Sequence, residues 1–197
     1  MKRFLPLWAA GLSLLLALGC STDSQAPESG GRLLSRDQIR LLSPADLPTK
    51  SHALDALADF TLEVQPGSVA AFVGSGVSLR VPAGAVATPV TIQARWLGGE
   101  NEALLGFEFG PAGQEFLAPL EFELTLPVSS NEVPGGDELL VVHDREDGWY
   151  EVVSNEVHWM SADEGVVVGA RLNHFSKYLV AVGPQPDPPV DNSGNNE

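Results

Sequence analysis

Apolar and polar residues alternate over short stretches in the middle of the chain. The clearest stretch covers residues 120–126, where leucine or phenylalanine occupies every second position and Glu121, Glu123 and Thr125 lie between. A period of two indicates a β-strand with one face on a core and the other in water. The same pattern predicts half-buried strands over residues 60–64, 77–81 and 90–96.

Six further apolar stretches predict more strands, at residues 104–109, 139–144, 149–153, 157–160, 166–172 and 178–182. Residues 139–142 are continuously apolar, as is typical of a central strand. Asp147-Gly148 separates two of the stretches and favours a hairpin turn. Many short strands with frequent turn signals predict an all-β fold, an antiparallel β-sandwich over residues 60–183.

The first nineteen residues have the pattern of a secretory signal peptide. Lys2 and Arg3 precede an apolar run over residues 4–18, which is followed by Gly19 and Cys20. The run is shorter than the roughly 20 residues of a permanent membrane span. Residues 16–20 resemble the lipobox of bacterial lipoproteins. The resemblance implies that the chain is cut before Cys20 and that Cys20 carries the lipid that anchors the protein in a membrane.

Residues 20–59 and 184–197 differ in composition from the predicted sandwich. Both are rich in Ser, Asp, Gly, Pro or Asn, which predicts a flexible tether and a disordered acidic tail. Within the tether, Ser35 and Gln38 have the spacing of a capping box, so residues 35–42 are compatible with a short helix. The resemblance to bacterial lipoproteins also implies, by their sorting rule, that Ser21 rather than Asp after the cysteine directs the exported protein to the outer membrane, if the host has one.

The charge and the residue types restrict the possible ligands. The chain has 26 acidic and 11 basic residues, a net charge of −15, which argues against nucleic-acid partners. One cysteine excludes an internal disulfide and multi-cysteine metal sites. The acidic run at residues 143–148 lacks the spacing of a calcium loop and is interpreted as a solvated turn. We therefore expect no metal and no cofactor.

Three segments carry a family resemblance. Residues 76–86 (GVSLRVPAGAV), 109–120 (FGPAGQEFLAPL) and 173–178 (NHFSKY) occur in the order found in the ZU-type domain of zonula occludens proteins, netrin receptors and ankyrins. The chain resembles this family over about residues 67–182. The resemblance implies a β-sandwich that acts in protein assembly or display, and family members are, as a rule, not enzymes.

The third segment suggests one chemistry. In relatives of the ZU type that carry a function-to-find domain, a similar His-Phe-Ser is a self-cleavage site. Carried over, this implies that Ser176 attacks the carbonyl of Phe175 and that the Phe175–Ser176 bond is cut. Such a hydroxyl needs a base. His174 is the nearest in sequence, and His158 is an alternative on a neighbouring strand. The alternative interpretation is a bend that leads into the last strand.

We therefore expect a membrane-anchored lipoprotein that displays a non-enzymatic interaction or structural domain toward an unknown protein partner. Self-cleavage at Phe175–Ser176 is the first alternative. The second is glycan binding through exposed tryptophans, for which Trp149 and Trp159 are open candidates, whereas Trp96 lies in phase with the apolar positions of its strand.

Overall fold

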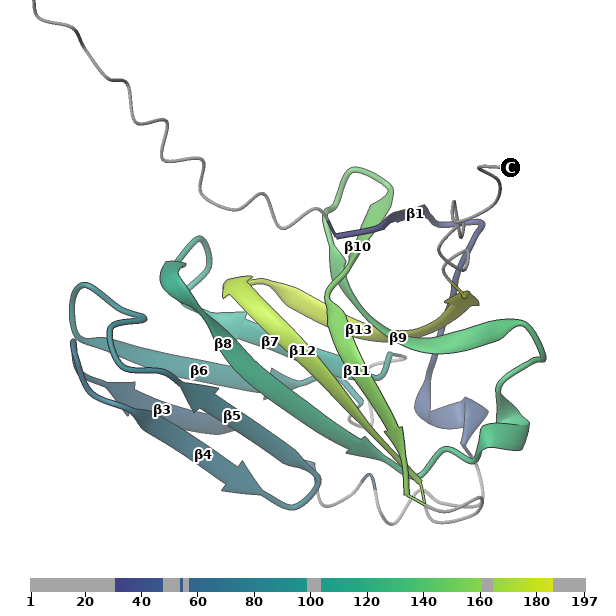
Figure 1. The fold of residues 1–197 in the computed structure, drawn as a ribbon, viewed down its shortest axis with the longest axis horizontal. Coiled ribbons are helices and arrows are strands. Elements are labelled where there is room, and N and C mark those ends of the chain that lie inside the picture. The colour runs from purple at the N-terminus through teal and green to yellow at the C-terminus, as the bar shows by residue number, and fades with distance from the viewer. Residues whose placement is uncertain (1–30, 48–53, 55–56, 99–103, 161–164, 186–197) are drawn as a thin grey trace, which may run out of the picture. The chain divides into compact units, whose positions relative to one another are not determined.

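The chain folds into two antiparallel β-sheets. The computed structural model describes residues 31–47, 54, 57–98, 104–160 and 165–185, all within the compact unit Gly31–Glu197. The predicted signal peptide, Cys20 and all of the predicted tail beyond residue 185 lie outside the described residues. Among the described residues, no helix is long and apolar enough to cross a membrane. The predicted all-β sandwich is confirmed, and the two layers are visible in Figure 1.

The larger sheet has eight strands in the order β1-β10-β9-β13-β7-β6-β3, with β2 paired to β13. Their bounds are β1 Leu33–Ser35, β2 Arg40–Leu41, β3 Phe60–Val64, β6 Val90–Trp96, β7 Gly106–Gly110, β9 Asp137–Asp144, β10 Trp149–Val152 and β13 Lys177–Pro184. The smaller sheet has the order β11-β12-β8-β5-β4. Its strands are β4 Ala70–Gly74, β5 Val77–Val81, β8 Glu115–Leu126, β11 Ser154–Trp159 and β12 Val166–His174.

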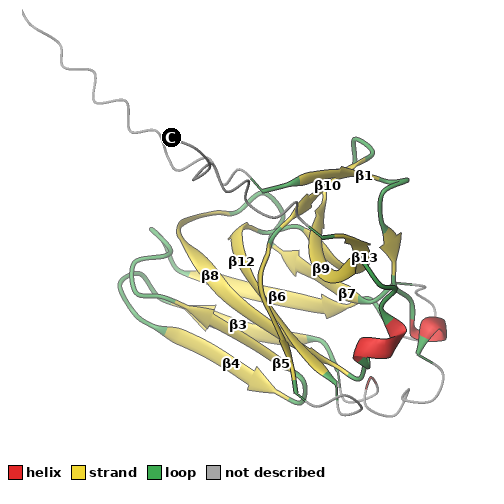
Figure 2. Cartoon of the chain, turned by 45° about the vertical axis from the view of Figure 1, so that its right-hand side comes forward, coloured by secondary structure: helices red, strands yellow, loops and turns green. Residues whose placement is uncertain are grey.

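Two short 3-10 helices complete the described elements. They are η1 (Pro44–Asp46) and η2 (Ser130–Glu132), drawn in red in Figure 2. In each, the residue before the helix and an acidic residue three positions later bond reciprocally. This is the capping-box arrangement, which satisfies the free backbone N–H groups at a helix start. Each of the ten predicted strands has a counterpart among the β-strands.

The main core lies between the two sheets. It is formed by the apolar side chains of alternating strand positions, such as Leu79, Phe122 and Leu124 of the smaller sheet. The rings of Phe107, Phe109 and Phe122 contact one another edge to face or tilted across this layer. Such aromatic pairs stabilise a fold beyond their buried area. The alternation seen in the sequence is therefore the alternation between core and water.

Strands β9 and β13 are buried on both faces, which explains their continuous apolar runs. On β9, Leu139 and Val141 face the main core, whereas Leu140 and Val142 belong to a second apolar cluster on the opposite face. That second cluster is completed by side chains from other elements, namely Leu34, Leu97, Tyr150, Leu179 and Ala181. A strand with both faces covered has no polar face to show in the sequence.

Part of the segment that we predicted as a tether belongs to the sandwich. Residues 31–47 contain β1, which pairs with β10, and β2, which pairs with β13. Leu34 and Leu42 of this segment are buried. Ser35 and Gln38 do bond to each other, but in the turn between β1 and β2 instead of a helix. The polar composition concealed these short strands, because Leu34 is the one buried side chain of β1 and neither residue of β2 is fully buried.

Gly106 in β7 lies against the backbone of the central strand β13. A Cβ atom there would be 2.2 Å from the carbonyl oxygen of Tyr178 and 2.9 Å from the Cα of Leu179. Backbone atoms cannot move aside cheaply, so we expect Gly106→Ala to lower the free energy of unfolding by about 1–3 kcal/mol. Gly135→Ala, where a Cβ meets nothing within 4 Å, is the matched control. Equal urea midpoints for the two variants would contradict this packing.

Candidate functional site

The chain crosses from one sheet to the other through two residues. β12 of the smaller sheet ends at His174, and β13 in the middle of the larger sheet begins at Lys177. Phe175 and Ser176 alone connect them, and Ser176 lies in a bend. The sequence motif His-Phe-Ser therefore forms a tight corner between the two layers.

Several contacts hold this corner in place. The N–H of Phe175 donates to the carbonyl of Gln114, and the N–H of Phe109 donates to the carbonyl of Ser176, each at 2.9 Å. The hydroxyl of Tyr178 donates to the carbonyl of His174 at 2.7 Å. The Phe175 ring is only 3% exposed and stacks on Phe109. Both peptide units flanking the Phe175–Ser176 bond are thus fixed by neighbouring strands.

A histidine from β9 faces the corner. His143 pairs with Tyr178 of β13 on one side and with Glu151 of β10 on the other. Directly paired residues of antiparallel strands point to the same face of the sheet. The register therefore places Glu151, His143 and Tyr178 in a row across the larger sheet, on the face that carries the main core.

The three groups Ser176, His143 and Glu151 form a connected series. The Nε2 atom of His143 lies 2.9 Å from the Oγ atom of Ser176, a hydrogen-bond distance. On the other side of the ring, Nδ1 lies 3.5 Å from Oε2 of Glu151. The order hydroxyl, imidazole, carboxylate is that of an activated nucleophile, in which the carboxylate orients the base.

The surroundings of His143 favour its neutral form. Its side chain is 13% exposed, and this burial lowers the pKa of His143, with the neighbouring His174 contributing to the lowering. Glu151 and Asp144 oppose the effect. A neutral imidazole with its proton on Nδ1 leaves Nε2 free to accept the hydroxyl proton of Ser176. Burial also raises the pKa of Tyr178, so that its hydroxyl remains a donor to the His174 carbonyl.

Solvent reaches one side of the corner. An open cavity of about 390 Å³ is lined by eleven residues, among them His143, Phe175 and Ser176. The loop between β9 and β10 borders it through Arg145 and Glu146. Water can therefore approach Ser176 while Phe175 remains packed in the core.

The structure brings together some of the predicted site residues and not others. Ser176, Phe175 and His174 lie at the corner, and the His174 ring is 4.5 Å from the His143 ring, centroid to centroid. His158 lies elsewhere, because it occupies the edge strand β11 opposite Val167 with its side chain exposed. The imidazole that contacts Ser176 is that of His143.

His143 and Glu151 were not selected from the sequence as site residues. Their pairing follows from the β9–β10 hairpin, in which the N–H of Arg145 donates to the carbonyl of Trp149 and residues 143 and 151 lie opposite each other. His143 is also in phase with Leu139 and Val141, so its side chain had to face the core. The phase of His143 indicates an imidazole that faces the core, but a two-residue turn at Asp147-Gly148 would have placed Asp144 opposite Glu151, so the sequence signals did not identify the pair.

The other candidates from the sequence lie apart. Residues 145–148 form the β9–β10 turn, in which Arg145 pairs with Asp147 at 3.3 Å. Trp149 is 46% exposed on β10, whereas Trp159 is half-buried on β11 in the other sheet. The two tryptophans therefore do not share one sheet face. Trp96 packs against the main core and contacts Phe107.

No protein-family model and no curated protein sequence matches this chain.

Proposed function

We propose that this protein is an exported, lipid-tethered β-sandwich that cuts its own backbone between Phe175 and Ser176. The observation that carries the proposal is the 2.9 Å contact between His143 Nε2 and Ser176 Oγ. Glu151 behind the imidazole and the two-residue corner between the sheets support it. The resemblance of residues 173–178 to the closing segment of self-cleaving ZU-type relatives points the same way.

The proposed reaction has two steps. In the first, His143 Nε2 takes the hydroxyl proton of Ser176, and Oγ bonds to the carbonyl carbon of Phe175. The C–N bond then breaks and the imidazolium returns its proton to the nitrogen, which leaves an ester on Oγ and a free amino group on Ser176. In the second step, water from the open cavity hydrolyses the ester. The products are a carboxylate at Phe175 and the free hydroxyl of Ser176.

The fragment that starts at Ser176 would stay bound after the cut. It contains β13, whose residues pair with β9, β7 and β2 inside the larger sheet. Six of the eight β13 residues are buried. Cleavage would therefore change the covalent connection without removing the strand, and would leave a terminal strand that force or a partner can withdraw.

The place of action is inferred from the N-terminal pattern. A leader of basic and apolar residues that ends at Cys20 supports export and lipid attachment, and an acidic chain supports an extracytoplasmic domain with little affinity for nucleic acids. Acyl chains at Cys20 would anchor the sandwich stably, because each buried CH₂ contributes about 0.8 kcal/mol.

Cys20→Ser is expected to move the protein from the membrane to the soluble fraction of a bacterial host. Serine offers no thiol for lipid attachment, so the mature chain loses its only proposed anchor. The measurement is fractionation together with incorporation of radiolabelled palmitate. Ser21→Ala, which retains the cysteine, is the control. Membrane retention of an unlabelled Cys20→Ser protein would refute the lipid anchor.

A second candidate is the interaction module without cleavage. The specific observation for it is the edge strand β4, which among the described strands is paired only with β5 and carries Val73 at 81% exposure. An exposed strand edge can accept an extra strand from a partner. If the chain is never cleaved, the interaction module is the remaining candidate. If polysaccharide changes the tryptophan fluorescence, glycan binding is favoured instead.

The proposal is tested by asking whether the purified protein contains one polypeptide or two. A denaturing gel is expected to show two, and sequencing of the shorter one is expected to start at Ser176. Hydroxylamine, which attacks esters, is expected to accelerate the appearance of both fragments in freshly synthesised protein. A single band that hydroxylamine does not change would refute self-cleavage.

A further inference from the structure

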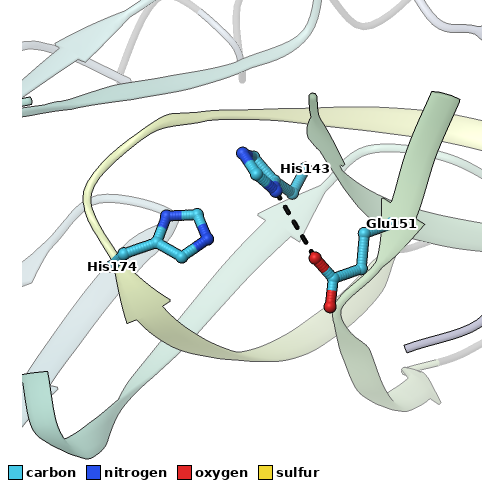
Figure 3. A group of neighbouring side chains, drawn as sticks. All are labelled: His143, Glu151 and His174. Atoms are coloured by element: carbon cyan, nitrogen blue, oxygen red, sulfur yellow. Dashed lines mark ion pairs between the residues drawn. The ribbon is translucent and has the colours of Figure 1, made fainter. Parts of the chain in front are cut away.

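Three side chains beside the corner carry the groups that bind transition metals. His143, Glu151 and His174 each offer one nitrogen or oxygen atom, and these three atoms lie within 4.8 Å of one another. The residues come from β9, β10 and the end of β12, so both sheets contribute (Figure 3). Figure 3 shows the His174 ring and the Glu151 carboxylate on either side of His143.

Nδ1 of His143 is buried and makes no hydrogen bond among the described residues, since the Glu151 carboxylate that faces it lies 3.5 Å away. A buried polar atom without a partner is costly, so native structures nearly always satisfy it. The other nitrogen of the same ring is already bonded to Ser176. The unsatisfied atom therefore points to a ligand that sits between His143 and Glu151.

We propose that His143 Nδ1, His174 and Glu151 bind one zinc ion. Two imidazoles and one carboxylate are a known zinc ligand set, which leaves the fourth position to water. In a tetrahedral zinc site the ligand atoms are about 3.4 Å apart. Side-chain rotation therefore has to shorten the distances between the three ligand atoms by about 1.4 Å at most. Two nitrogen ligands favour zinc over calcium and magnesium, which prefer oxygen ligands.

A zinc ion in this position would regulate cleavage. An uncharged imidazole that binds metal through Nδ1 carries its proton on Nε2. Nε2 would then donate to Ser176 Oγ and could no longer accept the hydroxyl proton. Zinc would therefore hold the chain uncut until it is removed. This consequence rests on the proposed self-cleavage, whereas the binding of zinc does not.

Binding is tested by titration calorimetry of zinc chloride into the Ser176→Ala protein, which retains all three ligands in one intact chain. One zinc ion per chain is expected, and magnesium chloride is expected to give no signal. Adding His174→Gln is expected to weaken zinc binding at least tenfold, while His158→Gln, at an exposed histidine on β11, leaves it unchanged. No binding, or equal binding after His174→Gln, would overturn the site.

The regulatory effect is tested with freshly synthesised wild-type protein. Micromolar zinc is expected to suppress cleavage at least tenfold, and a chelator to restore it. In His174→Gln, the ratio of the rates with and without zinc is expected to be close to one. Zinc binding to a chain that never cleaves would sustain the site and refute the proposed function. Cleavage that zinc does not change in a chain that binds it would refute the regulation.

Discussion

Replacing Ser176 by alanine is expected to leave every molecule as one uncut polypeptide. The methyl group of alanine cannot attack the Phe175 carbonyl, so neither the ester nor the free amino group can form. Ser176→Cys is expected to cleave still, because a thiol is an intrinsically stronger nucleophile. Mass spectrometry of the denatured proteins distinguishes the two results.

The fold should tolerate Ser176→Ala. The hydroxyl contacts His143 at the edge of an open cavity, and the backbone bond from Phe109 to the Ser176 carbonyl is retained. A circular-dichroism spectrum equal to that of the wild type therefore serves as the control. If the Ser176→Ala chain were also split at the same bond, an external protease would be responsible.

Replacing His143 by glutamine is expected to slow cleavage about 10²–10⁴-fold, the usual contribution of a positioned general base. Glutamine is similar in size but cannot accept the proton of Ser176 at neutral pH. His158→Gln, on the exposed face of β11, is expected to cleave at the wild-type rate. The rates are measured on protein synthesised in a cell-free system and sampled over time.

Comparing the two histidine variants tests whether the base is His143, the histidine that contacts Ser176 in the structure, or His158, the alternative chosen from the sequence. His143 is 33 residues away from Ser176, yet it makes the 2.9 Å contact. Glu151→Gln should slow cleavage as well, because the carboxylate that stabilises the imidazolium is lost. A slow His158→Gln protein together with a fast His143→Gln protein would contradict the assignment of the base.

Most strands of the sandwich could be predicted because they have one buried face and one solvent-exposed face. Residues 120–126 show this best, since Phe122 and Leu124 are buried while Glu121 and Glu123 face water. β4 was not predicted. It is an edge strand whose sequence, AAFVG, has no polar positions to mark its outer face. A half-buried strand shows an alternating pattern in the sequence only when polar residues occupy its exposed positions.

The candidate site could be predicted only in part, because it depends on register. The His-Phe-Ser motif identified Ser176 from local sequence. The proposed base and its carboxylate come from β9 and β10, and their approach requires the β9–β10 hairpin and the position of β13 beside β9. No pattern within a single strand specifies which strand lies next to it. The short strands β1 and β2 escaped prediction for the same reason, since pairing partners define them.

Native and denaturing mass spectrometry of one sample tests self-cleavage most directly. The sample is the purified wild-type protein, in a soluble form that starts at Ser21. We predict a single native particle heavier than the uncut chain by one water molecule, because β13 stays paired in the sheet. Under denaturing conditions we predict two polypeptides, one ending at Phe175 and one starting at Ser176. A single full-length polypeptide under denaturing conditions would contradict the account.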